Sequence, residues 1–112
     1  MNTTILYNED IAKEVETAVM CVFGCKLTDL VGFFDTDYKK IVVFVLSKLY
    51  GFDKRNIAQA YSMSYMYVPT VVDEIELRYL LDVKIREKLI EIVKIIGYES
   101  RAMDGSRIEF TA

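Results

Sequence analysis

The reactive side chains of this chain are few, and their spacing does not assemble a catalytic centre. The sequence contains no histidine, which removes the commonest general base and the commonest zinc ligand. Cys21 and Cys25 lie four residues apart on one helical face, a spacing typical of packed, reduced thiols rather than of a CxxC turn. The carboxylate pair Asp35 and Asp37 has no partner acid, base or metal cluster. The sequence therefore predicts a protein that is not an enzyme and that uses no metal or cofactor.

Cationic side chains suited to binding phosphate are concentrated in one stretch. The whole chain of 112 residues has a net charge of −3, which by itself does not indicate nucleic-acid binding. Residues 38–55, however, carry five Lys or Arg and one Asp. Two explanations fit this excess of positive charge equally well: a helix face exposed to solvent, or a surface that contacts phosphates. If the stretch binds phosphates, the expected contacts are Lys39, Lys40, Lys54 and Arg55.

The basic stretch leads into two short predicted helices, over residues 53–61 and 65–80, that are joined by a tight polar turn. Ser64 is a good N-cap for the second helix. Apolar residues lie at helical spacing on both helices. These residues are Ile57, Ala60 and Tyr61 on the first helix, and Val68, Val71, Val72 and Ile75 on the second. The layout predicts a helix-turn-helix, whose second helix usually reads the major groove of DNA.

On this interpretation, Tyr65, Tyr67 and Thr70 approach the groove of double-stranded DNA. Pro69 disturbs the start of the second helix, because its ring crowds the preceding turn and it lacks an N–H donor. The alternative is that the regular helix begins near Pro69, and that Ser64 to Val68 form a looser or 3₁₀ turn.

The second helix also supports a different interpretation, in which it binds protein. Its solvent side is expected to carry Asp73, Glu74 and Glu76, offset only by Arg78, and these acids would repel phosphates. Exposed Tyr and Met residues are typical of protein interfaces. The alternative function is thus a protein-interaction module that contacts its partner through residues 65–67 and 73–76. Such a module suits an adaptor or inhibitor, of a type that phages and mobile elements encode.

Helical periodicity and capping signals continue through most of the chain and predict an all-α, single-domain bundle of about five helices over residues 1–98. Residues 99–112 are expected to form a tail or a small hairpin around Asp104-Gly105. In the helix predicted over residues 37–50, the lysines Lys39, Lys40 and Lys48 are expected to face outward. Besides the two helices above, the expected elements are helices over 9–23, 37–50 and 83–96 and a helical turn over 29–34.

With this order of elements, the chain resembles the C-terminal DNA-binding domain of the bacterial replication initiator DnaA, in the Trp-repressor-like group of helix-turn-helix folds. The resemblance covers about residues 9–96. It rests on Asp29-Leu30, on the long helix from Lys39 to Leu49, and on residues 57–61, Ile-Ala-Gln-Ala-Tyr, which resemble the family's Ile-Gly-x-x-Phe. The resemblance implies the fold and a role in DNA binding. The family's DNA-contacting signature is replaced by residues 63–67, Met-Ser-Tyr-Met-Tyr, and no nucleotide-binding loop is present.

Composition adds expectations about assembly and location. The hydrophobic fraction is 53%, more than one small core readily hides, which predicts self-association as a homodimer. The first residues lack the basic and apolar pattern of a signal peptide, and the apolar runs are too short to span a bilayer. We therefore expect a cytoplasmic protein without membrane contact.

Overall fold

Helices follow one another along residues 7–97, the part of the chain that the computed structural model describes. No strand lies in this range, so the predicted all-α class is confirmed. None of these helices combines the length and the apolar character that a bilayer crossing requires. The tail or hairpin predicted for residues 99–112 lies outside the described residues. The elements are α1 (Glu9–Phe23), α2 (Thr28–Val31), α3 (Asp37–Phe44), the π-helical η1 (Val45–Leu49), α4 (Lys54–Ala60), the 3₁₀ turn η2 (Tyr65–Tyr67), α5 (Val68–Leu81) and α6 (Val83–Ile96).

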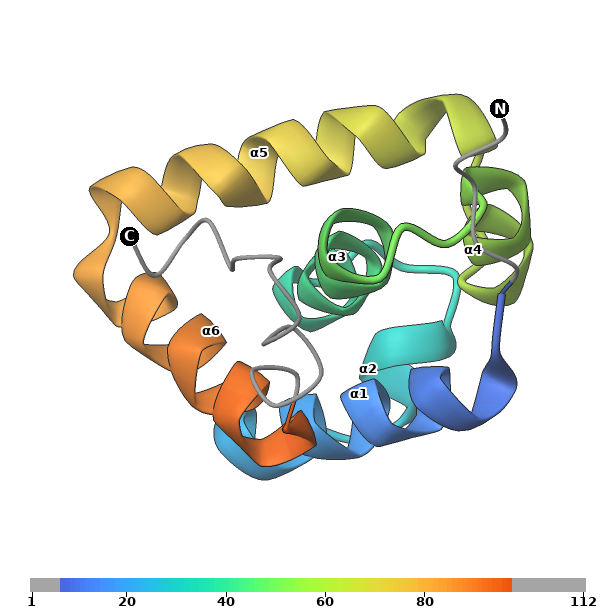
Figure 1. Ribbon diagram of the computed structural model, residues 1–112. Helices are drawn as coiled ribbons and strands as arrows, with labels where there is room; N and C mark the ends of the chain where they lie inside the picture. The colour runs from blue at the N-terminus through green and yellow to red at the C-terminus, as the bar shows by residue number, and fades with distance from the viewer. Residues whose placement is uncertain (1–6, 98–112) are drawn as a thin grey trace.

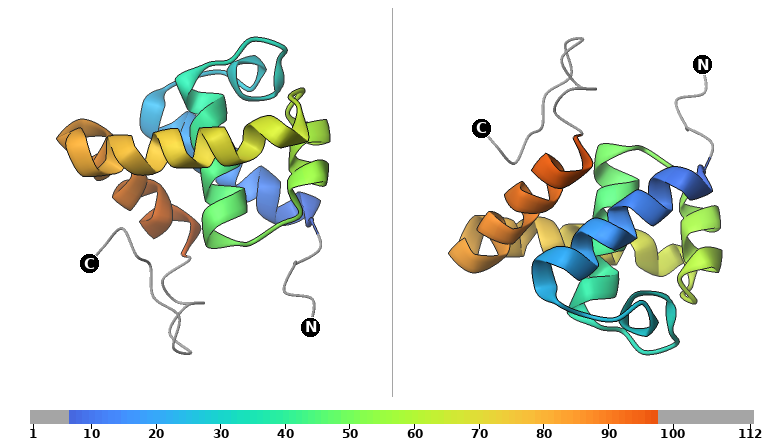
Figure 2. Two further views of the ribbon diagram at one scale, coloured as in Figure 1. Left: turned by 90° about the horizontal axis from the view of Figure 1, so that it is seen from above. Right: turned by 90° about the horizontal axis from the view of Figure 1, so that it is seen from below.

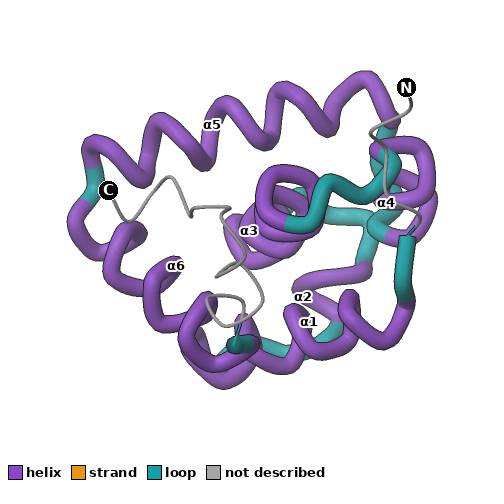
Figure 3. Tube along the Cα trace, in the orientation of Figure 1, coloured by secondary structure: helices purple, strands orange, loops and turns teal. Residues whose placement is uncertain are grey.

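Helix α3 forms the centre of the fold. All six residues from Ile41 in α3 to Leu46 in η1 are buried, as expected of a helical segment that is apolar on every side. Figure 1 shows α3 nearly end-on in the middle, with α5 above it, α1 below it, and α4 and α6 on the two flanks. The tube trace gives the same arrangement without strands (Figure 3). Helices α1, α2 and α5 pack directly on α3, whereas α6 packs on α1 and α5, and α4 packs on η1, η2 and α5.

Local capping explains where the outer helices begin and end. The side chains of Asn8, Thr36 and Asp82 accept hydrogen bonds from backbone N–H groups in the first turns of α1, α3 and α6. Gly24 follows α1 with a φ of +68°, a left-handed conformation that glycine adopts without strain. The first and last helices consequently have the bounds that the sequence predicted.

The helix predicted over residues 37–50 is present, but its second half is widened. After Phe44 the backbone bonds of an α-helix give way to the π-helical η1, and the Tyr50 N–H donates to the Val45 carbonyl at 3.3 Å. The prediction of one helix thus covers two consecutive segments, α3 and η1.

The segment predicted as a helix-turn-helix consists of α4, a turn over residues 61–64, η2 and α5. Helix α4 runs across the direction of α5 at its N-terminal end (Figures 1 and 2). Of the two sequence alternatives, the second is correct: a 3₁₀ turn comes first and α5 begins at Val68, with Pro69 in its first turn. Tyr61 is fully buried at the end of α4, and its hydroxyl donates to Glu16 Oε2 on α1 at 2.5 Å. This bond ties the turn to the body of the fold.

Candidate interaction surface at the α4–α5 turn

Lys39, the first residue predicted to bind phosphate, does not face solvent. Its side chain is 0% exposed, and its Nζ donates to the Gly32 carbonyl at 2.8 Å and lies 3.8 Å from Asp35 Oδ1. Burial lowers the pKa of Lys39, and the Asp35 carboxylate opposes that shift. The prediction of an outward-facing, phosphate-binding Lys39 is therefore wrong. The Lys39 side chain instead reaches the loop after α2, where it meets the Gly32 carbonyl and the Asp35 carboxylate.

Lys40 is also engaged within the protein. Its Nζ lies 3.1 Å from Glu74 Oε1 on α5, and its side chain is only 16% exposed. Burial opposes the charge of Lys40, but the Glu74 carboxylate outweighs burial, and the pKa of Lys40 is raised. A phosphate contact by Lys40 would have to displace this ion pair.

Two acidic side chains of α5 are paired with lysines from neighbouring elements. Glu74 faces Lys40, and Glu76 Oε2 lies 3.2 Å from Lys48 Nζ on η1. Arg78, expected to offset these acids, lies 3.8 Å from Glu74 Oε2 and also contacts Asp37 at 3.1 Å. The expectation that only Arg78 offsets the acids of α5 is thus wrong, because Lys40 and Lys48 lie against Glu74 and Glu76. The third acid, Asp73, is exposed.

Two of the four predicted phosphate ligands remain accessible. Lys54 and Arg55 are exposed in the first turn of α4. The Arg55 guanidinium carbon lies 4.2 Å from the centre of the Tyr65 ring, a cation–π contact that joins α4 to η2. Because Lys39 and Lys40 are engaged within the protein, the accessible cations of the predicted DNA interface are Lys54 and Arg55, in the first turn of α4.

The three predicted groove residues differ in their exposure. Thr70 is exposed, whereas Tyr65 and Tyr67 are half-buried against the core. Burial raises the pKa of Tyr67, and so does the hydrogen bond from its hydroxyl to Asp35. Between the two tyrosines, Met66 is 72% exposed. The turn therefore presents a thioether flanked by two partly covered rings.

The exposed side chains of α5 are not of the types that usually contact DNA bases. Arg, Lys, Asn and Gln are the side chains that usually contact base edges. None of them is among the exposed residues of α5, which are Pro69, Thr70, Asp73, Leu77, Leu80 and Leu81. An apolar helix face of this kind is more typical of a protein contact.

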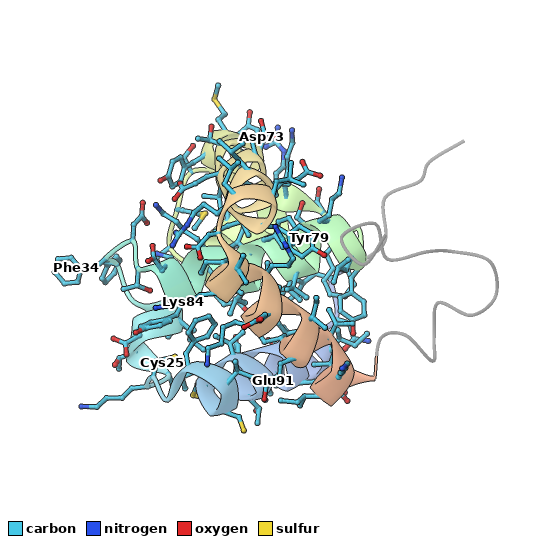
Figure 4. The ribbon with its side chains drawn as sticks, turned by 90° about the vertical axis from the view of Figure 1, so that its left-hand side faces the viewer. Cys25, Phe34, Asp73, Tyr79, Lys84 and Glu91 are labelled. Atoms are coloured by element: carbon cyan, nitrogen blue, oxygen red, sulfur yellow. The ribbon has the colours of Figure 1, made fainter. Side chains whose placement is uncertain are left out.

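Sequence reasoning missed the two most exposed aromatic side chains of the described region. Phe33 and Phe34 are 88% and 85% exposed, although residues 29–34 were predicted to form a helical turn. Figure 4 shows Phe34 pointing away from the body of the protein. The spacing gave no warning of this exposure, because Leu30 lies three residues before Phe33 and four before Phe34, as on one face of a helix.

The loop that carries these rings is held from several sides. Besides Lys39, the Thr36 hydroxyl donates to the Asp29 carbonyl, and the Ser62 hydroxyl donates to the Val31 carbonyl at 3.5 Å. A Cβ atom at Gly32 would lie 2.7 Å from the Thr28 carbonyl oxygen, so the close approach requires glycine. These contacts set the loop beside the α4–α5 turn.

We call this combined region the turn surface, and define it by its exposed members and the rings that flank them. Its members come from the loop after α2 and from η2. They are Phe33, Phe34, Tyr65, Met66 and Tyr67.

Potential metal ligands do not cluster over residues 7–97. No group of three or more His, Cys, Asp or Glu side chains that could hold a metal ion occurs in this range. Cys21 and Cys25 are free thiols, and burial, followed by the Asp29 charge, raises the pKa of Cys25. A raised pKa disfavours the reactive thiolate.

Comparisons of the chain with models of protein families, with curated proteins and with solved structures gave no match. The resemblance to the DnaA C-terminal domain therefore rests on the residue pattern alone.

Proposed function

We propose that this protein is a protein-interaction module, built on a helix-turn-helix made by α4 and α5, that binds its partner through the turn surface. The partner offers an apolar pocket that takes up the rings of Phe33 and Phe34. Aromatic side chains of this kind form the energetic centres of many interfaces. Adaptors and inhibitors work by such contacts, without chemistry of their own.

One observation carries the proposal: a fully buried lysine supports a loop that exposes two adjacent phenylalanines. Burying an ammonium group is costly unless it is well paired, and exposed rings risk nonspecific association. A fixed loop loses little conformational entropy on binding, which favours affinity. If Phe33 and Phe34 bind a partner protein, both the buried lysine and the exposed rings are explained.

DNA binding is the second candidate, and one observation favours it. Because Lys40 and Lys48 face Glu74 and Glu76, phosphates at α5 would meet fewer unpaired acids than the sequence suggested. Lys54 and Arg55 would then hold phosphates, with Tyr65, Tyr67 and Thr70 near the groove. With two accessible cations, the slope of log affinity against log salt is about −2, at about −0.9 per neutralised phosphate.

Two matched double variants separate these functions. Phe33→Ser with Phe34→Ser alters the loop, and Lys54→Glu with Arg55→Glu alters the basic edge of α4. Each is compared with the unaltered chain in capture of proteins from cells that produce it and in titration with duplex DNA at about 50 mM salt. We expect a captured protein that is lost with the phenylalanine variant and retained with the charge variant.

The opposite pattern contradicts the protein-interaction proposal. Salt-dependent DNA binding that is abolished by Lys54→Glu with Arg55→Glu, and unaffected by the phenylalanine variant, would establish the second candidate. Circular dichroism of both variants checks that helicity is unchanged.

A further inference from the structure

Three ion pairs of the described region, which join α3 to the loop after α2 and to α5, have the same orientation. In each of them the carboxylate is exposed to a greater degree than the cation that it faces. The pairs are Lys39 with Asp35 (0% against 41% exposed), Lys40 with Glu74 (16% against 35%) and Arg78 with Asp37 (29% against 57%). Positive and negative charges are equal in number here, but the negative ones lie nearer to solvent.

These carboxylates adjoin the turn surface. Asp35 directly follows Phe34 in the chain, and it accepts a hydrogen bond from the Tyr67 hydroxyl. The charge of Glu74 also acts on that hydroxyl. We call Asp35, Asp37 and Glu74 the acidic rim. The exposed rings of the loop are therefore bordered by carboxylates on the side that faces α3 and α5.

The side of the turn surface that faces α4 differs in charge. There the Arg55 guanidinium lies over the Tyr65 ring, 4.2 Å from its centre, and Lys54 is exposed in the same turn of α4. The acidic rim thus borders the turn surface on one side only. A ligand that covers the rings consequently meets opposite charges at its two ends.

Exposed carboxylates and covered cations differ in what they offer to a ligand. A carboxylate has about four lone-pair sites, so an exposed one that already faces a cation still accepts further hydrogen bonds. The ammonium of Lys39 is buried and donates to a backbone carbonyl, so it cannot reach a ligand. A cationic side chain can therefore bind the acidic rim without breaking an ion pair, whereas an anionic one meets like charge.

We infer that the partner segment that covers Phe33 and Phe34 is cationic, with Lys or Arg side chains that bind the acidic rim beside the apolar pocket. The inference rests on the proposed function, because it names the chemistry of the partner at the turn surface. Complementary charge on one side of an apolar contact fixes the orientation of the partner and raises the rate of encounter.

Selection of peptides tests this inference with the full chain as the target. The probe is a phage-displayed library of random peptides of about twelve residues, a length that covers a surface of this kind. We expect the selected peptides to combine aromatic or aliphatic residues with a mean net charge of about +2 or more. A labelled synthetic copy of the strongest binder should lose affinity at least about tenfold between about 50 mM and about 500 mM salt, by fluorescence anisotropy.

Two matched charge variants locate the contact. Asp37→Asn with Glu74→Gln removes two charges from the acidic rim and should weaken binding of the synthetic peptide about tenfold. Glu87→Gln with Glu91→Gln makes the same change in net charge at exposed positions of α6, and it should change the affinity less than about twofold. Asp35 stays unaltered because it faces a buried lysine. Circular dichroism checks that both variants fold.

Failure of the inference is distinguishable from failure of the proposed function. Peptides that lose binding to Phe33→Ser with Phe34→Ser, but have no positive charge or bind the rim variant unchanged, would overturn the inference and leave the proposed function standing. Equal losses with the rim variant and the α6 variant would also overturn it, since net charge alone would then explain the binding. Peptides that bind the phenylalanine variant as tightly as the unaltered chain, or a library without binders, would overturn both.

Discussion

Lys39 and Gly32 are joined by a hydrogen bond of 2.8 Å, from a lysine ammonium in the enclosed helix α3 to a backbone carbonyl in the loop above it. The bond removes from solvent the lysine that the sequence assigned to DNA. It also supports the loop at the position where Phe33 and Phe34 project. The same contact therefore weakens the DNA interpretation and strengthens the protein interpretation.

Lys39→Met should leave the fold intact and loosen the loop. Methionine fills a similar volume, and replacing a buried ion with an apolar side chain is often neutral or stabilising. We expect the midpoint of thermal unfolding to change by less than about 5 °C. The backbone order parameters of Phe33 and Phe34, measured by NMR relaxation, should fall below about 0.6.

Lys13→Met, at an exposed site on α1, is the control and should change neither quantity. Order parameters that stay at their original values in Lys39→Met would show that the lysine does not hold the loop.

Tyr61→Phe should weaken the connection between α4 and α1. Loss of the hydroxyl bond to Glu16 is expected to lower the free energy of unfolding at pH 7 by about 1 kcal/mol, measured by urea denaturation.

The same variant should flatten the alkaline limb of the stability profile. Burial, followed by the bond to Glu16, raises the pKa of Tyr61 above its ordinary value of 10.0, so the folded state keeps this proton. The unfolded chain releases the proton from about pH 10, and the stability from Tyr61 is therefore present below pH 10 and lost above it. The unaltered protein should lose up to about 1.4 kcal/mol per pH unit more than Tyr61→Phe above pH 10. Parallel profiles would contradict this role of Tyr61.

The Lys40–Glu74 pair should show measurable coupling in a double-mutant cycle. Lys40→Met, Glu74→Gln and the double variant are compared by their free energies of unfolding. Because both side chains are only partly exposed, we expect a coupling energy of about 0.5–1 kcal/mol, which decreases in about 1 M salt. A coupling energy below about 0.2 kcal/mol would show that Glu74 does not hold Lys40, which would then be free to contact a phosphate.

Phe33→Ser with Phe34→Ser should leave stability nearly unchanged. Both rings are almost fully exposed, so the free energy of unfolding is expected to change by less than about 0.5 kcal/mol. Phe44→Ser, in the centre of α3 and 1% exposed, is the contrasting variant and should cost at least about 3 kcal/mol. A loss above about 1.5 kcal/mol in the loop variant would show that the two rings serve folding rather than contact.

Most of the fold could be predicted from the sequence, because capping residues and apolar spacing act within a single helix. Asn8, Gly24 and Asp82 act on adjacent backbone groups, and the apolar spacing on α1 and α6 needs only one buried face. Residues 41–46 are a continuous apolar run, and the central position of α3 follows from it.

The candidate site was less predictable, because it depends on which charges meet across helices. The sequence counts Lys39 and Lys40 as cations but does not show that they lie against the Gly32 carbonyl and Glu74. Partners 34 residues apart meet only once α5 packs on α3. Phe33 and Phe34 were placed at the end of a helical turn over residues 29–34, but α2 ends at Val31, so both rings lie in the loop that follows it.

The most direct test of the central claim is photo-crosslinking at two positions in cells that produce the full chain. p-Benzoylphenylalanine replaces Phe34 in one variant and Lys54 in another, and the adducts are treated with nuclease or protease before mass analysis. The protein-interaction proposal predicts a discrete, nuclease-resistant protein adduct from position 34 and a weaker or absent adduct from position 54. A nuclease-sensitive adduct from position 54, together with no adduct from position 34, would contradict it.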